Sequence, residues 1–145
     1  MTRVFFTCTV LLGMVLAHAE YHSSTPAANA TLKILPSVIT INFSEAIEVR
    51  LSTFKVYPLN APQEAWSSST RLHQLAQPLV RQVLPLRNDA ARRVDAGVTT
   101  AARTSKTVAL ALKPNLPPGA YVVMWKNLGV DGHSVTDYFV FVYRP

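Results

Sequence analysis

Alternation of apolar and polar residues in several short segments constrains the fold of this chain more than any other feature. In "SVITINF" (37–43), Ile39, Ile41 and Phe43 would share one face of a strand. The segments "LSTFKVYPL", "TVALAL" and "AYVVMWKNL" show the same period, and "YFVFVY" is a dense β-branched and aromatic run. A period of two predicts strands, and the turn-rich "NAPQ", "KPNLPPGA" and "VDGHS" separate them. Short strands at this spacing predict an all-β domain, a two-sheet sandwich.

The segment from about residue 66 to 105 does not follow this alternation and predicts a partly helical insertion. Ser69 is expected to cap a helix that Pro78 kinks or ends. The apolar residues that would recur on one face of this helix are Leu72, Leu75, Leu79 and Val83. A second short helix is expected from Asn88 to Gly97. So long a connection is either functional or poorly ordered, and the sequence leaves both readings open.

The first residues are typical of a secretory signal. Arg3 precedes an apolar run from Val4 to Leu16, and the small residues Ala17 and Ala19 follow. The run is too short for a membrane-spanning helix, although a retained membrane anchor remains the alternative. We expect residues 1–17 to be a signal peptide and residues 18–145 to form one exported domain that is not inserted in a membrane.

Two cleavage positions fit the small-residue rule, and they produce different amino termini. Cleavage after Ala17 makes His18 the first residue, with a free α-amine. Cleavage after Ala19 removes this histidine and leaves Glu20 first. The rule slightly favours the later position, because "AHA" places alanine at both positions that the peptidase recognises. The signal alone does not decide between them.

Composition excludes several classes of site. The single cysteine, Cys8, lies inside the expected signal, so the processed chain has no disulfide, thiolate metal site or cysteine nucleophile. The net charge is +6, and removal of Arg3 leaves +5. Most of the arginines in the insertion stand among alanines and leucines and are not interleaved with aromatic residues. This pattern favours a solvated basic face and argues against nucleic acid as a partner.

Motifs of hydrolytic enzymes and nucleotide-binding proteins are absent from the sequence, and its few acidic residues form no acid–base pair. We therefore expect a protein that is not an enzyme. The best local candidate for chemistry is "VDGHS". Asp131 and His133 would point to the same side of an extended chain and could form part of a metal site. The alternative, which the local sequence alone favours, is a hairpin turn in which Asp131 bonds its own backbone and His133 is merely exposed.

Four segments together resemble the CopC family of periplasmic copper-binding proteins. They are "HAEYHSSTPA" at the start, "ITINFSEAIE" (39–48), "LPPGAYVVMWKNLGVDGHSV" (116–135) and the apolar last strand. The resemblance implies a periplasmic protein with a seven-stranded or similar Greek-key β-sandwich of immunoglobulin or cupredoxin type. Family members begin with a histidine eight residues before the proline of an S-x-P-A motif. Counting back from Pro26 gives His18, which favours cleavage after Ala17.

The resemblance also implies a set of Cu(II) ligands. They are His18, through its α-amine and its ring nitrogen, together with Asp131 and His133. Nitrogen and oxygen donors of this kind provide the tetragonal environment that Cu(II) prefers. An α-amine has an ordinary pKa near 7.7–8.0 and must lose a proton to bind, so the copper affinity is expected to fall in acid.

Several further residues are candidates for supporting roles. The resemblance places Glu45 and Trp125 close to copper: Glu45 would accept a hydrogen bond from a ligand histidine, or is simply a surface charge, and Trp125 is at least as well explained as core. His22 is a less favoured extra ligand, and His73 is weaker still. Met124, the only methionine after the signal, is expected in the core, so no methionine-rich Cu(I) site is predicted.

These observations favour a monomeric Cu(II)-binding protein that holds, buffers or delivers copper. A copper importer or a periplasmic copper enzyme would be its partner, and the role would be resistance, uptake or enzyme maturation. Two rivals remain. One is a copper-dependent oxygenase that uses an amino-terminal histidine. The other is a protein-docking module that acts through the amphipathic face of the basic insertion.

Overall fold

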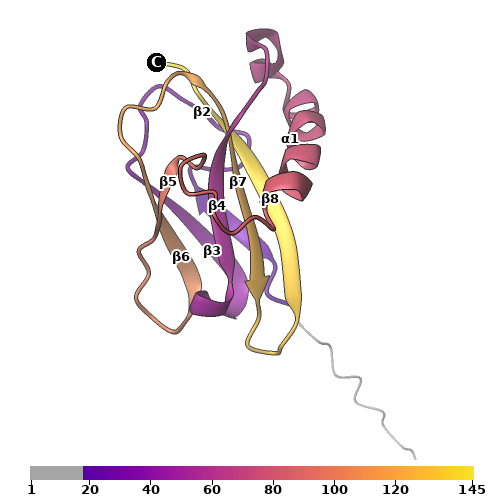
Figure 1. Cartoon of the computed structure of the whole chain (residues 1–145), viewed down its shortest axis with the longest axis vertical. Helices are drawn as coiled ribbons and strands as arrows, with labels where there is room; N and C mark the ends of the chain where they lie inside the picture. Colours follow the sequence, from indigo (N-terminus) through magenta and orange to yellow (C-terminus); the bar gives the residue numbers. More distant parts are fainter. Residues whose placement is uncertain (1–17) are drawn as a thin grey trace, which may run out of the picture.

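The computed structural model describes residues 18–145, which form two packed β-sheets and one α-helix (Figure 1). The first sheet has the order β1 (Tyr21–Thr25), β3 (Val38–Glu48), β6 (Thr104–Leu112) and β5 (Asp95–Val98). The second has the order β2 (Thr31–Leu32), β8 (Ser134–Tyr143), β7 (Gly119–Leu128) and β4 (Thr53–Leu59). Two 3-10 helices, η1 (Val49–Leu51) and η2 (Gln63–Ser67), precede the helix α1 (Ser69–Val83). The predicted Greek-key sandwich is confirmed, with eight strands of which β2 is very short.

The main core lies between the two sheets. Ile39, Ile41 and Phe43, the face predicted from the alternation, are all buried, as are Trp125 and Phe139 on the opposite sheet. The intervening residues of β3 are more exposed. Period-two patterning therefore fixed which side of this strand enters the core, because a slip by one residue would turn every apolar side chain to solvent.

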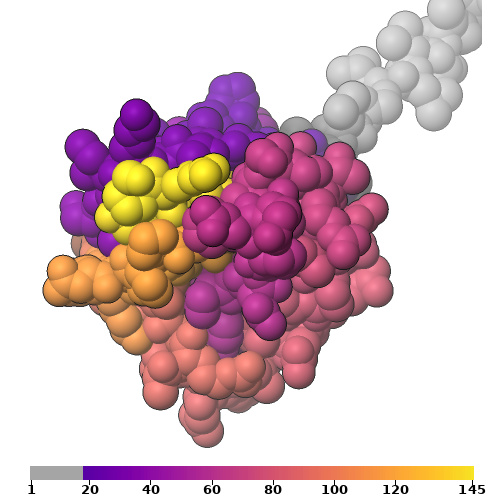
Figure 2. Space-filling model, turned by 90° about the horizontal axis from the view of Figure 1, so that it is seen from above, coloured from indigo at the N-terminus to yellow at the C-terminus, as the bar shows by residue number. Residues whose placement is uncertain are grey.

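The helix α1 covers the outer face of the sheet β2-β8-β7-β4, so that the sandwich has a third layer on one side (Figure 1). Its buried residues are Leu72, Ala76, Val80 and Val83, which pack with apolar side chains of β4, β7 and β8. The amphipathic face that motivated the docking alternative is therefore largely covered by the sheet. Seen from the end that carries the C-terminus, the segment containing α1 forms one flank of the molecule (Figure 2).

Two details of the predicted helix need correction. Ser68, and not Ser69, is the N-cap, since its side chain accepts a hydrogen bond from the backbone N–H of Arg71 at 3.3 Å. Pro78 lies inside α1 and does not end it. Proline costs about 3 kcal/mol in a helix interior, but packing against the sheet supplies most of the stability of such a helix. Gln74, whose carbonyl loses its partner, lies on the exposed side.

The second helix expected from Asn88 to Gly97 is not formed. This segment is a series of turns followed by β5, and it runs beside β4. Two buried carboxylates explain the difference. Asp89 accepts hydrogen bonds from Lys55 and Tyr57, and Asp95 accepts one from the backbone N–H of Val56. These long-range bonds override the local helical preference, and the 66–105 insertion is an ordered, structural part of the domain.

The turn between β7 and β8 lies at the end of the sandwich opposite the C-terminus (Figure 1). Residues 18–20 pass beside this turn, because Ala19 lies next to Gly129. The predicted signal peptide and its alternative, a retained anchor, fall on residues 1–17, which lie outside the described residues. Within residues 18–145, no helix is both long and apolar enough to cross a membrane.

Candidate metal centre

Three predicted ligands meet at the end of the sandwich. His18, Asp131 and His133 each offer one donor atom, and these atoms lie within 4.8 Å of one another. His18 Nδ1 is 3.7 Å from Asp131 Oδ2, and the two imidazole rings are 4.7 Å apart in an edge-on arrangement. All three side chains are partly open to solvent. Two distant parts of the sequence thus converge on one exposed cluster.

The Asp131–His133 turn has features of both structures considered for "VDGHS", a hairpin turn stabilised by Asp131 and a partial metal site. Asp131 Oδ1 accepts the backbone N–H of His133 at 3.0 Å, as in a side-chain-stabilised turn. Asp131 Oδ2 lies 3.1 Å from His133 Nδ1. Because a carboxylate only accepts hydrogen bonds, this contact places the imidazole proton on Nδ1 and leaves Nε2 free for a metal. Gly132 has a φ of 87°, which only glycine adopts without strain.

Hydrogen bonding keeps Asp131 ionised. The backbone N–H of His133 donates to the carboxylate and holds its pKa below the usual value, with a further contribution from the His133 side chain. This carboxylate, a candidate ligand, is therefore negatively charged at neutral and mildly acidic pH.

The segment that carries His18 is held from both sheets. On the β3 side, Ser44 Oγ donates to the carbonyl of His18 at 3.1 Å and accepts the backbone N–H of Glu20 at 3.0 Å. On the β7 side, the fully buried Asn127 donates from Nδ2 to the carbonyl of Ala19 at 2.8 Å. Ala19 itself is buried. These hydrogen bonds fix the backbone at and after His18. A fixed backbone of this kind would hold the His18 side chain in position before a metal binds.

Replacement of Asn127 by leucine is expected to weaken Cu(II) binding by roughly ten-fold, the lower part of the range for residues that orient metal ligands. The variant removes the only side-chain donor to the Ala19 carbonyl among the described residues. Competitive copper titration measures the effect, with the exposed Thr136→Val as a matched control. In a His18→Ala background the same replacement should cause no further loss, because its effect passes through His18. An equal loss in both backgrounds would contradict the positioning role.

Glu45 and Trp125 do not contact the cluster as ligands. Glu45 pairs with Lys106 at 3.7 Å and lines a hollow of about 190 Å³ beside Asp131. The hydrogen bond expected between Glu45 and a ligand histidine is not formed within residues 18–145. Trp125 is fully buried and stacks on Tyr21, so its core interpretation is confirmed. Met124 is fully buried as well, as predicted.

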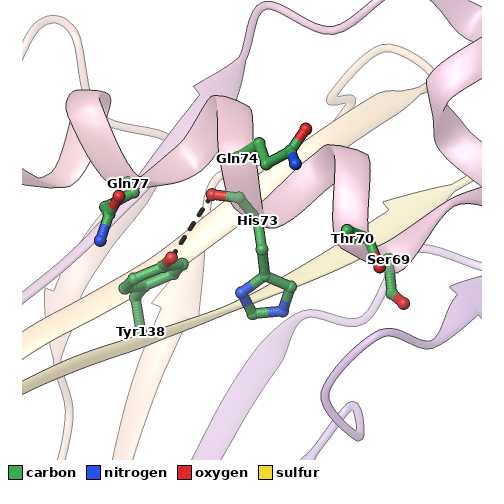
Figure 3. A pocket seen from close by; sticks show the side chains of 6 residues that line it. All are labelled: Ser69, Thr70, His73, Gln74, Gln77 and Tyr138. Carbon is green, nitrogen blue, oxygen red and sulfur yellow. Dashed lines mark hydrogen bonds between the residues drawn. The ribbon is translucent and has the colours of Figure 1, made fainter.

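The two remaining histidines lie outside the cluster. His22 is exposed on β1, next to the irregular pairing between Tyr21 and Ser23, and the described residues include no metal-ligating group that contains it. His73 lies on α1, where its ring faces Tyr138 (Figure 3). Its Nε2 is 3.1 Å from Asn29 Oδ1. The hydroxyl of Tyr138 donates to the His73 carbonyl at 3.4 Å (Figure 3). His73 thus ties the helix to the sandwich.

Three supporting residues were missed by the sequence interpretation: Ser44, Asn127 and Gly129. Asn127 could have been found, because it is the one polar residue on the inward row that contains Val123 and Trp125. A polar side chain on such a row needs a partner. Gly129 has no comparable signal: a Cβ there would stand 2.6 Å from Asp131 Oδ1, a constraint that appears only in three dimensions.

Comparisons with known proteins identify a matching family and similar folds. A family model described as "CopC domain" matches residues 21–86 and 77–144. "Protein YobA" of Escherichia coli strain K12 is 27% identical over 136 residues, which cover 93% of this chain and 86% of that protein. The fold resembles that of CopC from Methylosinus trichosporium OB3b, with a TM-score of 0.60, 20% identity and coverage of 88% and 95%. It also resembles PcoC, a methionine-rich copper resistance protein from Escherichia coli, with a TM-score of 0.59, 24% identity and coverage of 88% and 100%.

Proposed function

The chain belongs to the CopC family, which indicates a copper-related function, and we propose that it binds Cu(II) as a periplasmic copper carrier or buffer. The proposed ligands are the side chains of His18, Asp131 and His133. Cleavage after Ala17 would add the α-amine of His18 as a further donor. The amine and Nδ1 of one histidine close a six-membered chelate, and it is Nδ1 that faces Asp131.

The convergence of His18 with the Asp131–His133 turn is the single observation that carries this proposal. The three donor atoms lie within 4.8 Å of one another although more than a hundred residues separate His18 from the turn. A metal ion with bonds of about 2 Å to nitrogen and oxygen fits among atoms at this spacing. The hydrogen bonds of Ser44 and Asn127 would limit how far the cluster must rearrange on binding.

The chemistry of the donors favours Cu(II) over Cu(I). Imidazole, amine and carboxylate suit Cu(II), whereas thioether and thiolate ligands select Cu(I). The only methionine of residues 18–145 is Met124, and its side chain is fully buried in the second apolar cluster. The described part of the chain therefore offers no sulfur site at its surface.

The same arrangement supports binding and exchange over oxygenase catalysis. A carboxylate beside the two imidazoles favours the oxidised ion and occupies space that an oxygen-activating centre leaves open for substrate. The exposure of His18 and His133, 42% and 47% of their side chains, would allow a partner to reach the metal directly. We therefore propose a carrier or buffer and not an enzyme.

Copper titration of the processed protein tests this proposal. One tight equivalent of Cu(II) is expected, with an electron paramagnetic resonance spectrum typical of nitrogen and oxygen donors. His133→Ala should weaken binding by more than about a hundred-fold, because loss of a ligand exceeds the 10–100-fold effect of losing a group that only orients one. His22→Ala and His73→Ala serve as matched controls and should leave affinity unchanged. Equal losses in the His73 and His133 variants would contradict the assigned site.

A further inference from the structure

A basic groove lies beside the metal-bearing turn, on the outer face of the sheet β2-β8-β7-β4. It has a volume of about 530 Å³ and lies between the C-terminal end of α1 and strands β7 and β8. Its apolar wall includes Val80, Leu84 and Leu86, and its cations are Arg81, Arg87 and Lys126. The helix ends part-way along β8 and leaves the half of the sheet nearer the β7–β8 turn without a helical cover (Figure 1).

No acidic side chain within residues 18–145 balances the charge of the groove. No aspartate or glutamate lines it, and Arg81, Arg87 and Lys126 are exposed. None of the ion pairs formed within residues 18–145 involves these three cations. Leu86, on the same wall, keeps 39% of its surface exposed. Unpaired cations next to an exposed leucine indicate a surface suited to a ligand that is both acidic and partly apolar.

The groove is close to the proposed copper site along the strands. Lys126 pairs with Thr136 across β7 and β8, and both line the groove. Lys126 stands two positions before the end of β7 at Leu128, and Thr136 stands two positions after the start of β8 at Ser134. At roughly 3.3 Å per residue, this row is about 7 Å from the turn that carries Asp131 and His133.

We propose that this groove binds an acidic segment of the protein that exchanges copper with this chain. The inference rests on the proposed function, since it assigns the partner of the same site. Carboxylates of the segment would pair with Arg81, Arg87 and Lys126, and interspersed apolar residues would contact Leu84 and Leu86. A single-stranded nucleic acid fits less well, because no aromatic side chain lines the groove for base stacking. Binding here would place the partner beside the metal while leaving the ligands free.

A peptide titration followed by nuclear magnetic resonance tests the proposal. The probe is a synthetic ten-residue peptide that alternates glutamate with leucine, added to the isotope-labelled, copper-free protein, because paramagnetic Cu(II) would broaden the resonances of groove residues near the proposed metal site. Shifts are expected to concentrate at residues 80–87, 126 and 136. The triple variant Arg81→Glu, Arg87→Glu and Lys126→Glu should weaken binding by at least about ten-fold, since it turns three attractive contacts into repulsive ones.

The control is the triple variant Lys33→Glu, Arg50→Glu and Arg144→Glu, which changes the net charge equally at exposed positions outside the groove. It should retain most of the affinity for the peptide. Equal losses in the two triple variants would show binding to overall charge only and would overturn the proposal. Shifts elsewhere, or binding of the protein to phosphatidylglycerol vesicles but not to the peptide, would overturn it as well.

Copper affinity, measured for both triple variants, separates this proposal from the proposed function. The groove variant should bind Cu(II) as tightly as the original chain, because none of its three residues belongs to the metal cluster. If the original chain binds no copper but the peptide still occupies the groove, the proposed function fails while the acidic-segment site stands. If copper binds tightly and the peptide does not bind, only the groove proposal fails.

Discussion

A chain that begins at Glu20 is expected to bind Cu(II) more than about a hundred-fold more weakly than a chain that begins at His18, because it loses a ligand and not merely a group that orients one. The two forms differ by two residues, yet the shorter one lacks both the imidazole of His18 and the α-amine attached to it. What remains is the Asp131–His133 turn, which offers one carboxylate and one imidazole on an exposed surface. Isothermal or competitive titration of the two forms measures the difference directly.

A third form separates the amine from the imidazole. One glycine added before His18 keeps the side chain and the hydrogen bonds of Ser44 and Asn127, but it converts the α-amine into a peptide nitrogen. We expect this form to bind Cu(II) with intermediate affinity and an altered electron paramagnetic resonance spectrum. Equal affinity in all three forms would contradict the terminal chelate, whereas equal affinity in the glycine-extended and His18 forms would leave only the three side chains as ligands.

The acid dependence of binding follows from the same donors. The pKa of Asp131 is held below its usual value by the backbone N–H of His133, so this carboxylate stays charged as the pH falls. The α-amine, with an ordinary pKa near 7.7–8.0, is the donor that protons block first. The affinity of the His18 form should therefore fall from near neutral pH downward.

Local patterns were sufficient for the sandwich and for the proximity of Asp131 and His133, although the local sequence alone favoured a plain hairpin turn there over a metal site. Alternation placed Ile39, Ile41 and Phe43 in the core because a half-buried strand has only two faces. Asp131 and His133 are two residues apart, so their proximity follows from the chain itself. The position of His18 beside them was predicted only from the family resemblance, because no local pattern predicts which strand end lies next to which turn.

The errors share one physical origin, which is tertiary contacts that have no local signal. The segment after α1 has a plausible cap and stop for a helix, but Asp89 and Asp95 bond to β4 and hold it in turns and a strand. Pro78 was expected to kink or end α1, but the helix does not end there and continues to Val83, because Val80 and Val83 pack on the sheet. Local propensities are worth fractions of a kcal/mol per residue, and buried contacts exceed them.

Replacement of Asp89 by alanine is expected to lower the free energy of unfolding by about 3–5 kcal/mol, the cost of breaking a buried ion pair. Asp89 and Lys55 are 3% and 2% exposed, and their charged atoms are 2.6 Å apart. Lys55 also donates to the carbonyls of Val83, at the end of α1, and of Leu86. Without Asp89 its ammonium would remain buried beside neutral acceptors only. Chemical denaturation of the copper-free protein measures the loss.

A double replacement provides the control for this prediction. Lys55→Met together with Asp89→Leu removes both charges at similar volume and should destabilise the fold much less than Asp89→Ala alone, since the cost arises from the uncompensated charge and not from the absence of the pair. A double variant as unstable as the single one would contradict this explanation and would assign the effect to packing.

The pH dependence of stability tests the hydrogen bonds that join Lys55, Asp89 and Tyr57 through the ionisation of Tyr57. Burial, reinforced by the hydrogen bond that its hydroxyl donates to Asp89, raises the pKa of Tyr57 from 10.0 to about 12. Because the pKa is raised only in the folded state, the protonated Tyr57 hydroxyl contributes to the free energy of unfolding. This contribution is complete below pH 10 and disappears as the pH rises toward 12. Tyr57→Phe should remove this part of the decrease in stability at alkaline pH, measured by chemical denaturation.

Asp89 behaves in the opposite sense. Burial opposes its ionisation, but hydrogen bonds from Lys55 and Tyr57 outweigh burial and lower its pKa. Its contribution to stability is therefore lost only in strong acid.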